Sequence, residues 1–199
     1  SRRQRQMCIR DSPRTEDAGG GVFPKIKPPF HAVPCGGRHA VRPGTDNDIT
    51  TTKKMAVRYF TDDCTYRLPQ KRLTARWLHE VAAGEGYALG DVTYIFCSAQ
   101  RLLEMNRQYL GHDYFTDVIT FDYSDRKGAR IVSGDIFIDV ETVADNARLY
   151  GFPTLQEMRR VVVHGVLHLC GQGDKTPRTN AQMHRKEDKY LKFWEDPRQ

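Results

Sequence analysis

Several features that would assign this chain to a class are scarce or missing. No run of eighteen apolar residues occurs, which excludes a membrane-spanning helix. The basic residues at the amino terminus are not followed by the apolar stretch of a secretory signal. The five cysteines form no CxxC pair, and their odd number does not suit a disulfide framework. We therefore expect a cytoplasmic protein with reduced thiols and no membrane partner.

A net charge on the main part of the chain is also missing. Residues 1–54 carry 11 Lys and Arg against five Asp and Glu, which accounts for the whole formal charge of +6. The following 145 residues are neutral in sum. Bulk charge therefore indicates no polyanionic partner, and any affinity for nucleic acid has to come from a local group of cations.

Residues 1–54 lack the periodicity of helices or strands. They contain GGG, PP, CGG and PGTDND with few aliphatic residues, so we expect a disordered segment. Their opening, SRRQRQMCIRDS, looks like translated sequencing-adaptor sequence and is expected to be non-native, which makes Met55 the expected start. A functional basic tail is the alternative. In both interpretations residues 55–199 are the expected folded domain.

Periodic apolar patterns begin after Met55. They predict strands at 56–60, 92–98, 117–123 and 134–140, and helices at 71–83, 99–109, 142–150, 154–169 and 180–194. Thr154 is expected to cap the helix that follows it. Strands and helices mix without steady alternation, so the predicted class is α+β, a small mixed β-sheet with helices packed on it.

The most informative stretch is HGVLHLCGQGD, residues 164–174. His164 and His168 are one helical turn apart and share a face, so both imidazoles can reach one metal ion. Gly171 and Gly173 permit a tight reversal that can bring Asp174 to the same point. Two histidines and a carboxylate leave a fourth position for water, as in catalytic zinc sites. The alternative is a pair of histidines buried in the core.

The glutamate of the zinc-protease signature H-E-x-x-H is absent, because Gly165 follows the first histidine. Amide cleavage needs a proton delivered to a poor leaving amine. Phosphodiester cleavage can depend more on the metal and on nearby cations. The pattern therefore favours a metal-assisted nuclease over a peptidase.

Three motifs in the same order resemble the YbeY family of bacterial zinc-dependent endoribonucleases: HGVLHLCGQGD, TDVITFDY (116–123) and GDIFID (134–139). The resemblance covers Met55 to Trp194. It implies the YbeY α+β domain with one zinc ion per chain on a long helix in the C-terminal half. It also implies a single-strand-specific endoribonuclease in ribosomal RNA maturation and ribosome quality control. His164 and His168 would then act through a zinc-activated water. The implied partners of the protein are a ribosomal RNA precursor and, in addition, ribosomal subunits or ribosomal proteins.

Two positions depart from the family pattern. The third family histidine falls on Asp174 in an ungapped match, and a one-residue insertion would place it on Lys175, a poor zinc ligand. Asp174 is therefore the expected third ligand, and His184 is the alternative. The family arginine before T-D-V falls on Leu110, so Arg107, one turn earlier on the helix, is a candidate catalytic charge.

Other residues are candidates for holding RNA, although each could equally be a surface or core residue. Arg159, Lys175 and Arg178 are the expected RNA-binding cations, and Arg148 would join them in a local patch. Arg160 is a further candidate cation. Tyr109, Tyr114 and Phe115 could stack on bases. Two rival functions share the metal ligands: a zinc metallopeptidase, and a non-catalytic ribosome-assembly factor stabilised by zinc.

Overall fold

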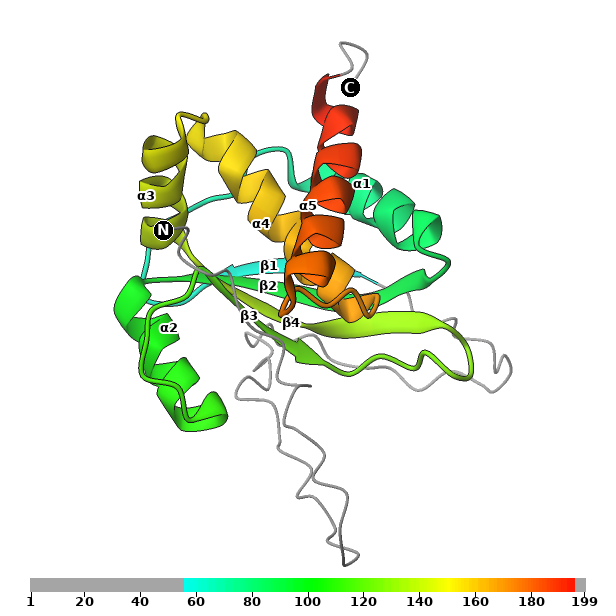
Figure 1. Ribbon diagram of the computed structural model, residues 1–199, viewed down its shortest axis with the longest axis horizontal. Coiled ribbons are helices and arrows are strands. Elements are labelled where there is room, and N and C mark those ends of the chain that lie inside the picture. The colour runs from blue at the N-terminus through cyan, green and yellow to red at the C-terminus, as the bar shows by residue number, and fades with distance from the viewer. Residues whose placement is uncertain (1–55, 196–199) are drawn as a thin grey trace, which may run out of the picture. The chain divides into compact units, whose positions relative to one another are not determined.

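The computed structural model describes residues 56–195 (Figure 1). The expectations for residues 1–54 lie outside this range. Along the described chain the elements are β1 (Val57–Thr61), α1 (Lys71–Gly84), β2 (Ala88–Cys97), α2 (Ala99–Met105), the π-helical turn η1 (Asn106–Leu110), β3 (Val118–Asp122), β4 (Ile131–Asp139), α3 (Val140–Tyr150), α4 (Thr154–Leu169), α5 (Pro177–Leu191) and the 3₁₀ turn η2 (Lys192–Glu195).

The four strands of the described region form one mixed sheet in the order β1-β2-β4-β3. β1, β2 and β4 run parallel, and β3 pairs antiparallel with β4 at the edge. In Figure 1, α1, α3, α4 and α5 lie over one face of the sheet, and α2 lies on the other. The predicted α+β class, a small mixed sheet with packed helices, is confirmed.

Alternation along the strands divides the core in two. On β2, Val92, Tyr94 and Phe96 join the large cluster with α4, whereas Ile95 and Cys97 join a smaller cluster with α2. The period of two along a strand sends these side chains to opposite faces. Both faces of β2 are therefore covered at this end, and α4 lies against the larger core.

Most predicted elements are found, with corrections at their ends. β4 begins at Ile131 rather than 134, α3 begins at Val140 rather than 142, and the last helix ends at Leu191 rather than 194. β2 begins at Ala88 rather than 92, because an irregularity between Leu89 and Val92 breaks the alternation there. Thr154 is the first residue of α4 and not its cap, since Pro153 occupies the cap position without a side-chain hydrogen bond. α5 begins at Pro177, after a capping box made by Thr176 and Thr179.

The predicted helix 99–109 changes its hydrogen bonding along its length. It is α-helical to Met105 and π-helical from Asn106 to Leu110. Asn106 is buried in this turn, and its side-chain amide nitrogen donates to the carbonyl of Tyr114 at 2.8 Å.

The cysteines within residues 56–195 are free, and no helix in that stretch is long and apolar enough to span a bilayer.

Candidate metal centre

Both histidines of the motif lie on the buried half of α4. From Val161 to Leu169 every residue of this helix is buried, because the sheet lies on one side and α5 packs against another. The hydroxyl of Tyr94 donates to the carbonyl of Val162 at 2.8 Å, which ties the helix to β2. These contacts fix the position of the helix relative to the strands.

Gly165 marks the closest approach of α4 to the sheet. A Cβ atom at this position would lie 2.8 Å from Cγ2 and 3.0 Å from Cδ1 of Ile136 on β4. The position that carries a glutamate in H-E-x-x-H therefore faces β4 and has no room for a side chain. The missing glutamate is a consequence of how tightly this helix packs.

The turn after α4 returns the chain toward the histidines. Gly171 has a positive φ of 92°, and its amide donates to the carbonyl of His168, while the amide of Gln172 donates to the carbonyl of Leu167. This is the helix-ending pattern for which a left-handed glycine is favoured. The Gln172 amide side chain holds the turn by donating to the Gly173 carbonyl at 2.9 Å. Asp174 follows and is 7% exposed.

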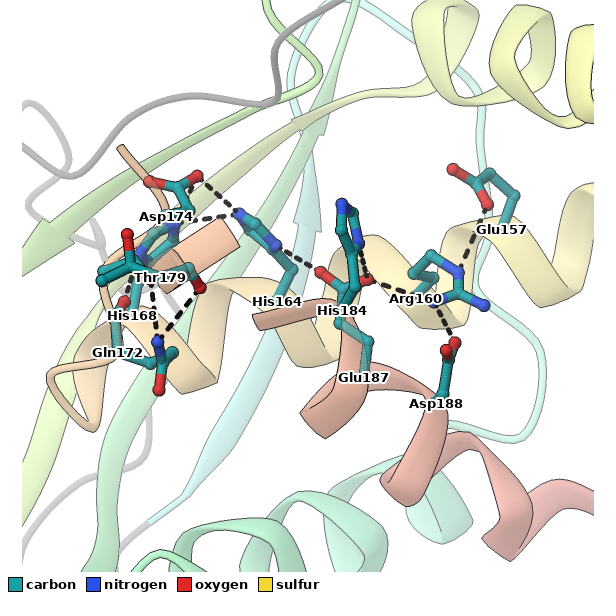
Figure 2. A network of polar contacts seen from close by, with 11 residues as sticks. Glu157, Arg160, His164, His168, Gln172, Asp174, Thr179, His184, Glu187 and Asp188 are labelled. Carbon is teal, nitrogen blue, oxygen red and sulfur yellow. Dashed lines mark hydrogen bonds and ion pairs between the residues drawn. The ribbon is translucent and has the colours of Figure 1, made fainter. Parts of the chain in front are cut away.

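Three potential ligand atoms meet at one point (Figure 2). Nε2 of His164 lies 2.8 Å from Nε2 of His168. Oδ2 of Asp174 lies 3.7 Å from the first and 3.6 Å from the second. A point equidistant from three atoms with these separations is about 2.0 Å from each, the length of a bond from zinc to nitrogen or carboxylate oxygen. The residues therefore fit a first-row metal ion.

The hydrogen bonds of the two imidazoles give a second reason to place a cation there. Nδ1 of His164 lies 2.7 Å from a carboxylate oxygen of Glu187, and Nδ1 of His168 lies 2.8 Å from the carbonyl of Gln172. Both oxygens accept, so each Nδ1 carries the proton and each Nε2 carries a lone pair. Two lone pairs then face each other beside Oδ2 of Asp174, a buried carboxylate oxygen 3.6–3.7 Å from both nitrogens. A bound cation would satisfy all three atoms.

The charge state of Asp174 agrees with this arrangement. Burial raises the pKa of its carboxyl, but the imidazoles of His168 and His164 outweigh burial and bring the pKa below its ordinary value. The carboxyl is therefore ionised at neutral pH, which is the form that binds a cation.

Sequence reasoning missed Glu187. The buried residues of α5 are Met183, Glu187 and Leu191, spaced four apart, so an acid stands within an apolar stripe. A buried carboxylate needs a polar partner, so an acid within an apolar stripe could have indicated that Glu187 has one. His184, the alternative third ligand, has its Nδ1 3.1 Å from Oε2 of Glu187, and it does not belong to the group formed by the other two histidines and Asp174.

The candidate cations lie in different surroundings. Lys175 and Arg178 are exposed in the segment directly after Asp174. The guanidinium of Arg159 lies 3.7 Å over the ring of Trp194 and donates to the Gln70 side chain, so it links α4 to η2 and to the start of α1.

The remaining candidate arginines are engaged in ion pairs. Arg107 pairs with Asp113 at 2.6 Å on the surface, and Arg148 pairs with Asp145 on α3. Arg160 is bound to acids of α5, with 2.5 Å from its Nη1 to Oδ1 of Asp188. Arg160 is linked to the candidate metal centre through Glu187, whose Oε2 lies 3.1 Å from the arginine's Nη1.

The three aromatic candidates divide in the same way. Tyr109 packs edge-on against Phe121, with ring centroids 5.4 Å apart, and is partly buried against the smaller core cluster. Tyr114 and Phe115 are 39% and 54% exposed. Tyr114 and Phe115 are thus the more exposed of the three, and the ring of Tyr114 stacks on His112.

Two histidines and a carboxylate, gathered on a helix and the turn that ends it, form a group that could hold a metal ion, as in metal-dependent enzymes. The sequence profile described as Endoribonuclease YbeY matches residues 60–195. Two proteins named Endoribonuclease YbeY, from Bacteroides thetaiotaomicron and Phocaeicola vulgatus, are 47% and 50% identical to this chain. The alignments cover 69% and 61% of this chain and 98% and 86% of those proteins. The chain belongs to the YbeY endoribonuclease family.

Another relative of the same name, from Cytophaga hutchinsonii, is 44% identical over 70% of this chain and 96% of that protein. The solution structure of TM1509 from Thermotoga maritima is 26% identical, with a TM-score of 0.48 over 71% of this chain and 94% of that chain.

Proposed function

We propose that this protein is a cytoplasmic, single-strand-specific, zinc-dependent endoribonuclease acting in ribosomal RNA maturation and ribosome quality control. One zinc ion per chain would be held by His164, His168 and Asp174. The observation that carries the proposal is the convergence of these side chains, with both Nδ1 atoms already bonded to acceptors. The substrate class is supported by membership of the YbeY endoribonuclease family.

The chain's residues contribute orientation and charge to this reaction. The two imidazoles present lone pairs, and Asp174 presents a buried carboxylate. When bound, zinc lowers the pKa of a coordinated water and draws charge from a phosphoryl oxygen. Because α4 and its turn are fixed by core packing, the three ligands require little rearrangement to bind the ion.

The RNA strand is proposed to run beside Asp174, where Lys175 and Arg178 are exposed and can contact phosphates. Arg107 is proposed as the charge that replaces the family arginine, which requires it to exchange Asp113 for a phosphate. Arg159 is retained as a third RNA-binding cation. Tyr114 and Phe115 would stack on unpaired bases, which fits a single-stranded substrate. The precursor of ribosomal RNA is the proposed substrate, with ribosomal subunits or ribosomal proteins as further partners.

The packing of Gly165 bears on the peptidase alternative. A protease-type general base one residue after the first histidine would collide with Ile136 and would face the sheet. A peptidase would therefore need its base from another element. The structure offers no such support for peptide hydrolysis at this position.

The test is RNA cleavage by the full chain, using single-stranded and double-stranded ribosomal RNA fragments. We expect the wild-type protein to cleave single-stranded RNA, to lose activity with a chelator, and to regain it when zinc is added. His168→Ala should be inactive under all three conditions. Cleavage of an unfolded protein without cleavage of RNA would establish the peptidase instead. Ribosome maturation supported by a folded His168→Ala variant would establish the non-catalytic assembly factor.

A further inference from the structure

The carboxylate of Glu187 is the most completely buried acidic group in contact with the candidate metal centre. Its residue is 0% exposed, on the face of α5 that packs toward α4. A buried carboxylate persists only where partners replace its lost hydration. Glu187 has such partners on both oxygens, and they come from two helices.

One oxygen of Glu187 faces the metal centre. Oε1 lies 2.7 Å from Nδ1 of His164, whose Nε2 points at His168 and Asp174 (Figure 2). Because a carboxylate oxygen accepts, this contact fixes the proton on Nδ1 and the lone pair on Nε2. It also fixes the plane of the ring, since His164 contacts the centre on one edge and Glu187 on the other.

The second oxygen of Glu187 is held by positive charge. Oε2 lies 3.1 Å from Nη1 of Arg160 and 3.1 Å from Nδ1 of His184. Arg160 is itself held by Asp188 at 2.5 Å, with Glu157 3.8 Å away. Arginine has only donors, so it holds the Glu187 oxygen that faces it as an acceptor and directs the other oxygen to His164.

We propose that Glu187 is the positioning residue of the metal centre: with Arg160 behind it, it sets the tautomer and orientation of His164 so that Nε2 can bind the ion. This inference rests on the proposed metal site and adds a residue that contacts neither the ion nor the RNA. His168 obtains the same orientation from a nearby backbone carbonyl, that of Gln172. The two ligands therefore depend differently on the side chains around them. A substitution of Glu187 on α5 therefore acts directly on His164.

Glu187→Gln is the sharpest perturbation because it preserves shape. Glutamine has one acceptor oxygen where glutamate has two, and both Arg160 and His164 require an acceptor. The charged guanidinium makes the stronger hydrogen bond, so the amide oxygen should face Arg160 and the NH₂ group should face His164. His164 must then accept at Nδ1 and carry its proton on Nε2, which removes the lone pair that would bind the ion.

The experiment measures zinc affinity of the full chain by competition with a chromophoric chelator. We expect Glu187→Gln to weaken zinc binding roughly 10- to 100-fold, the usual effect of removing a carboxylate that orients a metal-binding histidine. Asp188→Asn is the matched control, with the same chemical change one residue further on α5. Asp188 is 62% exposed in its side chain and contacts Arg160 but not His164, so its variant should bind zinc within about twofold of wild type.

A second measurement does not require metal. Long-range ¹H–¹⁵N NMR of the metal-free protein reports which nitrogen of His164 carries the proton. We expect Nδ1 in the wild type and in Asp188→Asn, and Nε2 in Glu187→Gln, with matching circular dichroism spectra showing that all three are folded.

The outcomes separate this inference from the proposed function. Zinc affinity and His164 tautomer unchanged in folded Glu187→Gln would overturn the role of Glu187 while leaving the metal site intact. Failure of the wild-type protein to bind zinc at all would overturn the proposed function, and this inference with it. Equal weakening in Glu187→Gln and Asp188→Asn would show a general effect of α5 and would also overturn the specific role of Glu187.

Discussion

Gly165→Ala tests whether α4 is held against the sheet as closely as the structure indicates. The new Cβ would lie 2.8 Å and 3.0 Å from two carbons of Ile136, well inside the optimum of about 3.5–4.0 Å for carbon atoms. Overpacking of this kind lowers the free energy of unfolding by roughly 1–3 kcal/mol. Alanine recovers about 1 kcal/mol through its helix propensity. The expected net loss is therefore up to about 2 kcal/mol.

The effect of Gly165→Ala on the free energy of unfolding should have the opposite sign when the Ile136 side chain is shortened. Ile136→Ala removes both carbons that the new Cβ would meet and by itself costs roughly 2–5 kcal/mol. In that background Gly165→Ala fills part of the cavity and keeps its propensity gain, so it should stabilise by about 1 kcal/mol or more. Ile136→Val, which retains Cγ2, gives an intermediate background.

Urea unfolding followed by circular dichroism gives the four free energies of this double-mutant cycle. A chelator should be present throughout, because an ion that binds only the folded state would add its own stabilisation. Equal effects of Gly165→Ala in the wild-type and Ile136→Ala backgrounds would refute the close approach. The glycine would then need another explanation than the contact with β4.

Three further predictions concern the metal ligands and two polar contacts. Wild-type protein should contain about one zinc ion per chain by elemental analysis, and Asp174→Asn should lose most of it; full retention would remove Asp174 as a ligand. Arg126→Met deletes the donor to the Leu169 carbonyl at the end of α4 and removes the cation beside Asp122, whose side chain is only 9% exposed. Its unfolding free energy should fall by roughly 1–3 kcal/mol. Arg130→Met is the control, because Arg130 makes a comparable carbonyl contact on the surface. An equally small change in unfolding free energy in both variants would contradict the prediction. Burial raises the pKa of Glu85, but hydrogen bonds from Lys186 and Tyr190 outweigh it and bring the pKa below its ordinary 4.5. A lowered folded-state pKa gives stability that is present above pH 4.5 and is lost as the pH falls through the folded value. Glu85→Gln should therefore lower the melting temperature at about pH 7 and change it little near pH 3. An equal loss of melting temperature at both pH values would show that ionisation of Glu85 is not involved.

The metal motif was predictable because its geometry is local. His164, His168 and Asp174 lie on one helix and the turn that follows it, so the helical period and two glycines are enough to predict that they meet. The long apolar pattern of α4 likewise predicted a buried helix. Periodicity identified the strands for the same reason, since side chains on one face of a sheet recur at every second residue of a strand.

The features that were missed depend on contacts between distant segments. Glu187 becomes an orienting residue only because α5 packs across α4, and no spacing within α5 reveals which histidine it meets. The start of β2 was missed because Gly90 and Asp91 interrupt its alternation at the irregularity in the ladder. The π-helical turn after Met105 shows the same limit, since its buried Asn106 side chain donates to the carbonyl of Tyr114 beyond the turn.

The proposed ligands are encoded within eleven consecutive residues, 164–174, whereas the carboxylate that orients His164 comes from a residue 23 positions further along the chain. Part of the affinity for zinc should therefore persist in the denatured chain, where this short segment can still wrap around an ion. Ligand binding to the denatured state reduces the stabilisation gained by mass action. Heating curves recorded with and without zinc should thus differ by less than the affinity of the native protein implies, and the ion should speed refolding by gathering this segment early.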